Sequence, residues 1–565
     1  MPPAELAAPT IPGPLTIPGL LVVRRREDAD LRALVGDDDA VTYRELDDAS
    51  RALAARLVAA GVGKGSRVGL VMPNGVGWAV HALAVTRLGA VLVPLSTLLR
   101  PPELVAQLRA AAVTQLVVVP AFRGRDYRAE LDAEVPGLTE CLRAGGRQPA
   151  VPSLRAVWTP DELPTAAAPV ELVDALERVV RPADDLVVLF TSGSSGGPKG
   201  VLHTHGNALR AVASSLDARR VGPGERLYIP MPFFWTGGFG SGLLSVLVAG
   251  ATLLTEAEPE PGRTLRFLER ERVTLFRGWP DQAARLAAHP DFPTVDLSSL
   301  RPGSLGAILP AAARPAAGAR ANLFGMTESF GPYCGSRLDT DLPAGKHGSC
   351  GQPFAGVEVR VVDPATGQPL PPGAEGEIRL RGPHLMRGIC GRHRANVFDR
   401  DGFYPTADAG VLDAEGYLWY RGRLDDMFKV SGATVYPLEV ESALRGLAGV
   451  REAFVTDVAD ETGDRQVAAL VVVTPDATAG PGATDRSDAT AGPDATDRAD
   501  GLAGPDGLAE LARSRLSSFK VPTRWLVVTD PAGVPRLASG KVDVGALRRL
   551  LRDQGVVRSR KVRPT

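Results

Sequence analysis

Hydrophobic residues in the first half of the chain follow two alternating spacings. Leu46, Leu53 and Leu57 recur at helical spacing, and Gly61 stands where such a helix would end. A short run rich in β-forming residues follows at Arg67 to Met72. The same alternation of helical and strand patterns recurs at residues 115–119, at residues 186–190 and around residues 243–254. This alternation predicts an α/β fold with mixed or parallel sheets in a large N-terminal region.

The pattern changes after about residue 421. We expect strands at residues 453–458 and 467–473 and a basic helix at residues 544–552. Between them, residues 475–506 form a degenerate repeat of Asp, Ala, Thr, Gly and Pro. Such a segment buries too little apolar surface to offset its ordering entropy, so we expect a disordered insertion. The sequence therefore predicts a second, smaller domain.

Length, charge and cysteine spacing exclude several classes of function. The 565 residues exceed what one hydrophobic core usually supports. Lys and Arg total 64 and Asp and Glu total 65, which gives a net charge of -1. A nearly neutral chain does not attract nucleic acid or an anionic membrane by its overall charge. The four cysteines lack metal-ligand spacing, and the sequence contains neither a signal peptide nor a long apolar run. We expect a soluble, cytoplasmic protein that acts on small molecules, and the oligomeric state stays open.

The segment Thr191 to Gly200 carries the first candidate chemistry. Its glycines, hydroxyls and one lysine suit a phosphate cradle after the strand at residues 186–190. The candidate ligands are Thr191, Ser192, Gly193, Ser194, Ser195, Gly196 and Lys199. Pro198 and Gly200 exclude a Walker-type P-loop. A plain Gly/Ser linker and a nucleophile elbow, with Ser195 as the nucleophile of a hydrolase, are the alternatives.

Four further segments follow this loop in order, and they favour one family. They are residues 324–329 (FGMTES), 406–408 (TAD), 421–441 (beginning RGRLDDMFKVSG) and 535–541 (PRLASGK). Together with the loop they resemble the adenylate-forming superfamily of acyl-CoA synthetases, peptide-synthetase adenylation domains and beetle luciferases. The resemblance covers roughly residues 41–552. Ala407 departs from the usual glycine, and Leu537 departs from the usual threonine.

The resemblance implies that the protein binds ATP and Mg²⁺, and it assigns roles to several residues of the ATP site. Phe324 and Gly325 would contact adenine, and Thr327 the α-phosphate. Glu328 would hold Mg²⁺, because a hard cation prefers carboxylate oxygen. Asp408 and Arg423 would bind the ribose.

The resemblance also implies a second half-reaction, with coenzyme A or a phosphopantetheine as the acyl acceptor. Lys541 would stabilise the first transition state. The C-terminal domain would then rotate about Asp425 and present Lys429 and Gly432 to the thiol.

The domain limits follow from these assignments. We expect an N-terminal tail (1–25), an AMP-binding adenylation domain (26–421), a hinge (422–426), a mobile C-terminal domain (427–555) and a basic tail (556–565). The fold class is accordingly α/β with α+β subdomains: a large multi-sheet N-terminal domain and a small mobile one.

The acid itself is the least defined part. Phe234, Trp235, Gly237 and Gly306 are expected to line its pocket. Trp235 stands near the position where amino-acid-activating relatives carry an aspartate, so an unpaired ammonium is disfavoured and a fatty or aryl acid is preferred. The segment from Gly306 to Asn322 is shorter than its family counterpart, which leaves room for a small or unusual acid. A stand-alone adenylation enzyme that feeds a carrier protein is the main alternative to an acyl-CoA ligase.

Overall fold

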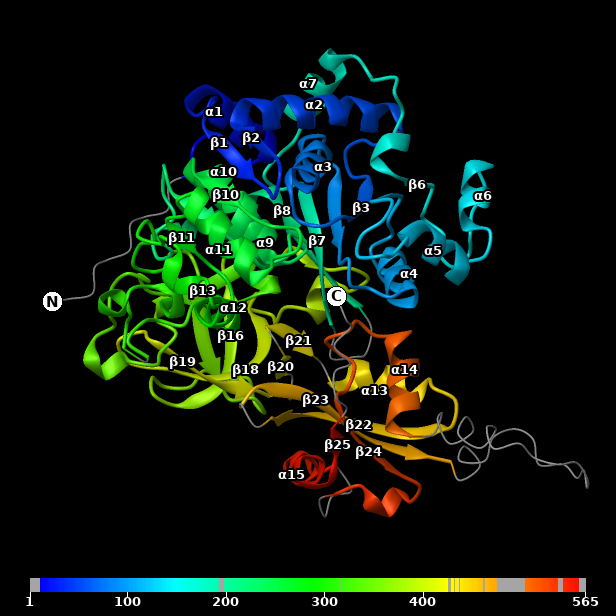
Figure 1. Ribbon diagram of the computed structural model, residues 1–565, viewed down its shortest axis with the longest axis vertical. Helices are drawn as coiled ribbons and strands as arrows, with labels where there is room; N and C mark the ends of the chain where they lie inside the picture. Colours follow the sequence, from blue (N-terminus) through cyan, green and yellow to red (C-terminus); the bar gives the residue numbers. More distant parts are fainter. Residues whose placement is uncertain are drawn as a thin grey trace, which may run out of the picture. The chain divides into compact units, whose positions relative to one another are not determined.

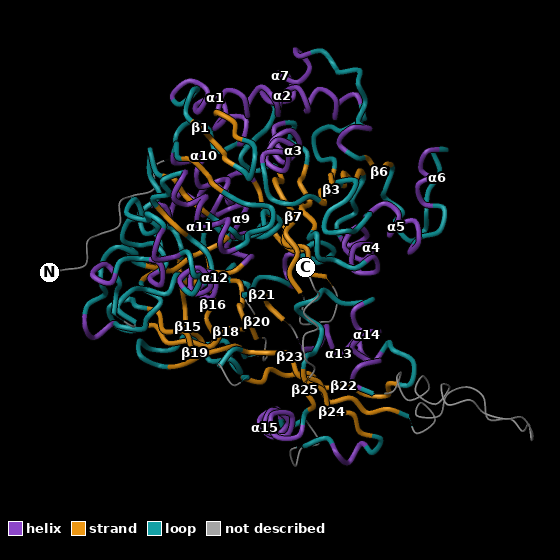
Figure 2. Tube along the Cα trace, viewed as in Figure 1, coloured by secondary structure: helices purple, strands orange, loops and turns teal. Residues whose placement is uncertain are grey.

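The structure is a computed structural model, and it falls into two units. It describes residues 11–192, 198–316, 318–424, 428–430, 432–435, 437–460, 463–474, 504–536 and 542–557. Unit 1 comprises residues 1–97, 107–191 and 199–424, and unit 2 comprises residues 98–106, 192–198 and 425–565. Each unit combines helices with strands (Figure 2). The expected hinge residue Asp425 lies outside the described residues.

The largest sheet of unit 1 has seven strands. Their order is β17 (Gly388–Ile389), β8 (Pro198–Thr204), β7 (Asp185–Ser192), β4 (Val91–Leu95), β3 (Arg67–Val71), β5 (Gln115–Val118) and β6 (Ala156–Trp158). The strands from β7 to β6 run parallel. Parallel strands are covered on both faces, which explains why their sequences are almost continuously apolar.

A second sheet of unit 1 has five strands. Their order is β11 (Leu275–Phe276), β9 (Arg226–Tyr228), β10 (Thr252–Leu254), β1 (Arg32–Val35) and β2 (Ala40–Thr42). All neighbours are parallel except β2, which pairs antiparallel with β1. Ligands of open α/β sheets bind outside the carboxyl ends of such parallel strands.

Two antiparallel sheets complete unit 1. One contains β12 (Phe324–Met326), β13 (Gly331–Gly335) and β14 (Gln352–Pro353). The other contains β15 (Glu358–Val362), β16 (Glu375–Arg381), β18 (Tyr404–Leu412) and β19 (Leu418–Arg423). They carry the two motifs FGMTES and TAD.

Helices pack between and around these sheets (Figure 1). They are α2 (Tyr43–Ala59), α3 (Val76–Arg87), α5 (Tyr127–Glu134), α6 (Leu138–Arg143), α7 (Val170–Arg178), α8 (His205–Leu216), α9 (Thr236–Gly238), α10 (Ser245–Ala249), α11 (Pro261–Arg270) and α12 (Pro280–Ala287). Helix α4 (Pro101–Ala110) crosses the division between the units, because residues 98–106 belong to unit 2. Trp78 of α3 packs edge-on against Phe233 and Phe239, with ring centroids 5.2 and 5.6 Å apart. This contact joins the core to the segment expected to line the acid pocket.

The N-terminal segment differs from the expected tail. Residues 17–27 form helix α1 (Ile17–Glu27), and the Thr16 hydroxyl accepts a hydrogen bond from the Gly19 N–H group at its start. Ile17, Leu20 and Leu21 are buried in the main core. Pro18 fits because proline is tolerated in the first turn of a helix. The N-terminal segment that we expected to be a tail therefore contains a helix docked on the core of unit 1.

Unit 2 is an α+β structure. Its main sheet contains β22 (Val450–Ala459), β23 (Arg465–Val473), β24 (Arg524–Val528) and β25 (Val556–Val557), and a hairpin is formed by β20 (Phe428–Val430) and β21 (Ala433–Val435). The helices are α13 (Pro437–Arg445), α14 (Pro505–Arg513) and α15 (Val544–Gln554). The expected insertion lies largely outside the described residues, but its last two residues begin α14.

The predicted α/β fold class is confirmed. The expected strands at residues 67–72, 115–119, 186–190, 453–458 and 467–473 correspond to β3, β5, β7, β22 and β23. Within the described part of the chain, no helix is both long and apolar enough to cross a membrane.

Candidate active site

The FGMTES motif forms a tight turn between β12 and β13. Thr327–Ser329 is a single 3-10 turn, and Phe330 ends it with a left-handed φ of 56°. A side chain at Gly325 would overlap the Gly331 carbonyl of the facing strand, so glycine is required there by close packing. The turn thereby holds Thr327 and Glu328 in one defined conformation.

Two other segments fix the backbone of this turn. His203 is fully buried on β8, and its Nε2 donates to the Thr327 carbonyl at 2.8 Å. Asn207 lies 2.7 Å from the other ring nitrogen, Nδ1, which is consistent with Nδ1 accepting from the amide. The Met386 N–H group donates to the Glu328 carbonyl at 2.8 Å. The turn is therefore positioned by residues far from it in sequence.

Glu328, Lys199 and Tyr404 form a compact polar cluster. The Lys199 ammonium pairs with Glu328 Oε1. Lys199 Nζ also donates to the Tyr404 hydroxyl at 2.9 Å, and that hydroxyl donates to Glu328 Oε1 at 3.1 Å. Burial alone would raise the pKa of the Glu328 carboxyl, but the charge and hydrogen bond of Lys199 outweigh it and hold that pKa below its ordinary value. Glu328 is thus an ionised carboxylate in a buried site.

These residues fit a nucleotide with its metal ion. The buried Thr191 Oγ1, at the entrance to the glycine-rich loop, has no hydrogen-bond partner among the residues that the structure describes and is suited to a phosphate oxygen. Among the described residues, no group of three or more His, Cys, Asp or Glu could hold a metal by itself. Mg²⁺ is commonly held by one or two carboxylates together with substrate phosphates and water, so Glu328 suffices as its protein ligand.

Phe324 belongs to an aromatic cluster that could receive adenine. Its ring lies 4.7 Å from the ring of Tyr420 at a tilt of 38° and 5.5 Å from that of Tyr333. The Tyr333 hydroxyl is buried, without a hydrogen-bond partner in the described part of the chain. Phe324 is partly buried and Tyr420 is exposed, so one side of the cluster is open for stacking.

Asp408 lies on β18, opposite Arg423 on β19. The Asp408 side chain is buried, and its backbone N–H group donates to the Thr406 hydroxyl at 3.0 Å. The preceding Ala407 has a φ of 57°, in the left-handed region that favours glycine. Alanine thus occupies, at a conformational cost, a position where the resemblance led us to expect glycine.

Replacing Ala407 with glycine is expected to raise the free energy of unfolding by about 0.5–1 kcal/mol. Glycine removes the strain of the left-handed conformation, which stabilises the folded state. Part of this gain is lost because glycine also increases the conformational entropy of the unfolded chain. Urea unfolding of the two proteins measures it. Ala409→Gly on the same strand is the control and should destabilise; an unchanged or lower stability of Ala407→Gly would contradict the strain.

Three of the four expected acid-pocket residues, Phe234, Trp235 and Gly237, lie in the segment that follows β9. Asn74 fixes this segment: its side chain accepts from the Phe233 N–H group at 2.8 Å and donates to the Met231 carbonyl at 3.0 Å. The rings of Phe234 and Trp235 meet edge-on at 5.4 Å. Gly237 packs against Met231, and a side chain there would clash with its sulfur. Gly306 begins a 3-10 turn at residues 306–308, where the shortened segment starts.

Unit 2 carries the residues expected for the second half-reaction. Lys429 is exposed on β20 and pairs across the hairpin with Thr434 of β21. Gly432 lies between the two strands with a φ of 79°. Gly193, Ser194, Ser195, Gly196 and Lys541 lie outside the described residues, and the side chains of Ser192 and Arg423 are likewise not described.

Sequence reasoning missed His203 and Tyr404. Tyr404 stands two residues before the TAD motif, and His203 follows the glycine-rich loop, so both were within reach of the motifs. Nothing in their spacing shows that they meet Glu328 and Thr327, because 76 and 124 residues separate the partners. A buried polar residue next to a motif was the available signal.

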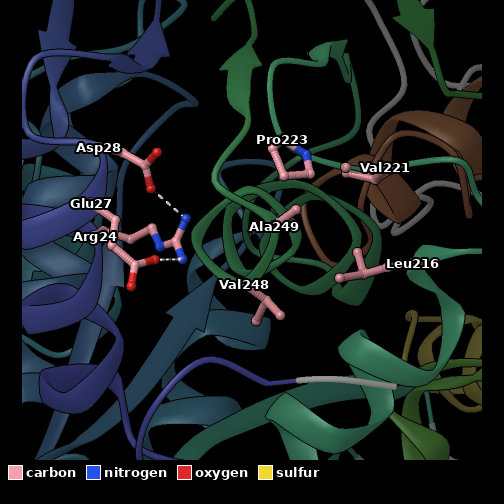
Figure 3. Close-up of a pocket in the computed structure, with 9 residues that line it drawn as sticks. Arg24, Glu27, Asp28, Leu216, Val221, Pro223, Val248 and Ala249 are labelled. Atoms are coloured by element: carbon pink, nitrogen blue, oxygen red, sulfur yellow. Dashed lines mark hydrogen bonds and ion pairs between the residues drawn. The ribbon is translucent and has the colours of Figure 1, made fainter. Parts of the chain in front are cut away.

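A cavity of about 420 Å³ lies apart from these residues, lined by parts of α1 and α10 (Figure 3). Arg24, the cation at its wall, already pairs with Glu27 at 3.2 Å and with Asp28. None of the motif residues lines this cavity.

Comparison with known proteins places these features in context. The model of the AMP-binding enzyme family matches residues 22–390. The chain is 33% identical over 548 residues to a 3-[(3aS,4S,7aS)-7a-methyl-1,5-dioxo-octahydro-1H-inden-4-yl]propanoyl:CoA ligase of Mycobacterium tuberculosis, covering 95% of this chain and 99% of that protein. It is 34% identical over 534 residues to a feruloyl-CoA synthase of Amycolatopsis sp, covering 94% and 97%. The solved amide bond synthetase McbA of Marinactinospora thermotolerans superposes with a TM-score of 0.73 at 26% identity, covering 94% of this chain and 99% of that one.

Proposed function

Because this chain belongs to the AMP-binding enzyme family, we propose that it activates a carboxylic acid with ATP and transfers the acyl group to coenzyme A. The family membership predicted from the sequence is confirmed. The relatives that support the assignment are themselves CoA ligases or synthases. The proposed setting is the cytoplasm, where ATP and coenzyme A are both present.

One observation carries the proposal: the buried cluster of Glu328, Lys199 and Tyr404. An ionised carboxylate and an ammonium group lie side by side, next to the strand that leaves the glycine-rich loop. This pair can serve a metal-bound polyphosphate, since the carboxylate suits the cation and the ammonium suits a phosphate oxygen. A hydrolase would require neither feature.

The first half-reaction needs positioning and charge neutralisation rather than a base. The acid is already ionised at neutral pH, because its pKa is about 4. Its oxygen attacks the α-phosphorus of ATP, a bond forms between them, and the bond to the pyrophosphate oxygen breaks. Lys199 and the loop would neutralise the phosphates, with Thr327 at the α-phosphate and Lys541 bridging the two anions. Mg²⁺ held by Glu328 would supply additional charge neutralisation on the phosphates.

The second half-reaction replaces AMP with a thiol. The sulfur of coenzyme A attacks the acyl carbon, the carbon–oxygen bond to AMP breaks, and the thiol proton is lost to solvent. In our proposal unit 2 turns about Asp425 between the steps, so that Lys541 leaves and the β20–β21 hairpin with Lys429 and Gly432 arrives. A carrier-bound phosphopantetheine has the same thiol chemistry, but the CoA ligases among the relatives favour the free cofactor.

The acid is proposed to be fatty or aryl rather than an α-amino acid. Phe234 and Trp235 offer an aromatic wall, and neither carries a charge that would pair with an ammonium. This residue-level argument agrees with the feruloyl relative, whose name denotes an aryl acid.

The test is acid-dependent release of pyrophosphate from ATP and Mg²⁺, followed by thioester formation when coenzyme A is added. We expect release with a fatty or aryl acid and none with α-amino acids. The matched control is Glu328→Gln, which keeps the shape of the side chain and removes its charge. If coenzyme A leaves the acyl-AMP unconsumed while a carrier protein or an amine consumes it, the proposed acceptor is wrong.

A second variant tests the ribose assignment. Asp408→Ala is expected to raise the KM for ATP roughly 10- to 100-fold while kcat changes little, because a ribose contact stabilises ground and transition states alike and a hydrogen bond to a charged group contributes about 1.5–3 kcal/mol. Initial rates at varied ATP measure both constants. An unchanged KM for ATP would show that Asp408 does not bind the nucleotide.

A further inference from the structure

Two arginine side chains are buried together in unit 1 without a carboxylate partner among the described residues. Arg277 directly follows β11 and is 8% exposed, and Arg219 follows α8 and is 3% exposed. Arg277 Nη2 donates to the Arg219 carbonyl. Arg219 donates to the Ser245 hydroxyl at 2.8 Å and to the Ser241 carbonyl. Arg277 Nε is buried, and no described residue forms a hydrogen bond with it.

Such a pair is electrostatically incomplete. Burial lowers the pKa of Arg219 to about 10 and that of Arg277 to about 9, where the charge of Arg219 contributes as well. Both groups nevertheless stay protonated at neutral pH. Buried cations are normally paired, because leaving water without a counter-charge is costly.

The acidic groups that face Arg277 are already engaged elsewhere. They are Glu225 and Asp339. Glu225 pairs with Arg301, and Asp339 pairs with Arg337 at 2.9 Å. Neither forms an ion pair with Arg277 within the described part of the chain, so the site retains unneutralised positive charge.

The arginines lie beside the expected acid pocket. Strands β9 and β11 are parallel, with Phe276 opposite Tyr228, so Arg277 stands at the carboxyl edge of the sheet. The pocket segment leaves β9 at this same edge, which is where ligands of α/β sheets bind. Gly303, which stands three residues before the expected pocket residue Gly306, is also close to Arg277. A side chain at Gly303 would lie 3.4 Å from Arg277 Nη2.

A π-helix, η2 (Phe239–Leu244), connects the pocket segment to the arginines. A side chain at its Gly240 would touch the ring of Phe330, two residues after Glu328, at 2.9 Å. The next residue, Ser241, offers its carbonyl to Arg219. The segment therefore runs from the FGMTES turn, where the acid is activated, to the arginine pair.

We propose that Arg277 binds a second anionic group at the far end of the acid, so that the preferred substrates are dicarboxylic acids. The inference rests on the proposed acid activation and specifies its substrate class. The planar guanidinium suits a carboxylate because it offers two parallel donors. Arg219 is a positioning residue: its carbonyl holds Arg277, and its guanidinium holds the π-helix.

The experiment compares matched acids that differ only in the second carboxylate: hexanedioate with hexanoate, and 4-carboxycinnamate with cinnamate. The wild type is expected to show a higher kcat/KM for pyrophosphate release with at least one diacid than with its partner. Arg277→Met should lower the diacid value roughly 10- to 100-fold and change the monoacid value less than about threefold. Arg277→Lys should retain part of the preference, and Arg266→Met, which removes a largely exposed arginine of the same unit that pairs with Asp291, should leave the preference unchanged.

Binding of the diacid without ATP gives an independent readout. The diacid should raise the thermal midpoint of the wild type and of Arg266→Met but not that of Arg277→Met. Equal loss of diacid and monoacid activity in Arg277→Met, or no diacid preference in the wild type, overturns the inference. Failure of pyrophosphate release with every acid overturns the proposed function instead, and the thermal shift then still decides whether Arg277 binds a diacid. If Arg277→Met does not fold, Arg277→Lys decides by the same two measurements.

Discussion

Replacing Lys541 with alanine is expected to slow pyrophosphate release by about a hundredfold to a thousandfold. In the proposed first step, negative charge accumulates between the attacking carboxylate and the triphosphate, and Lys541 would stand between them. Loss of one such preorganised donor typically costs ~3 kcal/mol of transition-state stabilisation. Release of pyrophosphate from ATP in the presence of saturating acid measures this step.

The same variant should consume supplied acyl-AMP and coenzyme A at nearly the wild-type rate, because Lys541 would have left the site by then. Lys429→Ala is the matched control, since it removes an exposed lysine of unit 2. It should spare pyrophosphate release and slow transfer to the thiol. Equal slowing of both half-reactions by both variants would contradict the alternation of unit 2 between two positions.

The second large effect concerns acid stability, through four buried histidines in the described part of unit 1. Burial lowers the pKa of one of them, His81. Burial is the main cause that lowers the pKa of His203, His205 and His384 to about 4 each. In the unfolded chain a histidine takes up its proton near pH 6.5. As the pH falls from about 6.5 to 4, the unfolded state therefore binds protons that the folded state does not, and stability is lost.

Each histidine contributes at most about 3 kcal/mol to this loss, at 1.36 kcal/mol for each unit of pKa difference. Four such groups are significant against a stability of roughly 5–15 kcal/mol for a native protein. We expect the urea midpoint of unit 1 to fall steeply between pH 6.5 and pH 4. Tryptophan fluorescence monitors the unfolding.

A single substitution isolates one histidine. His205 Nδ1 accepts from the Ile17 N–H group at 3.2 Å, and an asparagine oxygen can take that role. His205→Asn should therefore flatten the pH dependence by roughly one quarter, as one of four such groups, whereas His393→Gln, at an exposed position, should leave it unchanged. An identical pH dependence of all three proteins would show that these buried rings do not control acid unfolding.

The sequence predicted the local elements and the order of the motifs because both depend on short-range patterns. Strands β3, β5 and β7 are continuous apolar runs, and each motif is a contiguous string. The helix at residues 17–27 was missed because residues 1–25 were assigned to a tail, although Pro18 after Thr16 is itself a helix-start pattern. That error concerned the interpretation of a local signal.

The contacts that build the site could not be predicted, because they are set by packing between distant segments. The meeting of Lys199, Glu328 and Tyr404 depends on three different sheets. The unpaired charge of Arg277 is likewise invisible in sequence, where an arginine after a strand is most simply a surface residue. Ala407 was recognised as a departure from the motif, but its left-handed φ required the structure.

The π-helix has a consequence for how the substrate range of this enzyme could change. At its end the Ser245 N–H group bonds to the Gly240 carbonyl, five residues earlier, instead of four. A wide turn of this kind holds one residue more than an α-helical turn of the same phase. Deleting one residue within residues 239–244 would restore an ordinary α-helix while the flanking helices keep their orientation. Chain length can therefore vary by one residue at this point of the proposed acid pocket without rotating the structure that follows, a change that substitution cannot produce.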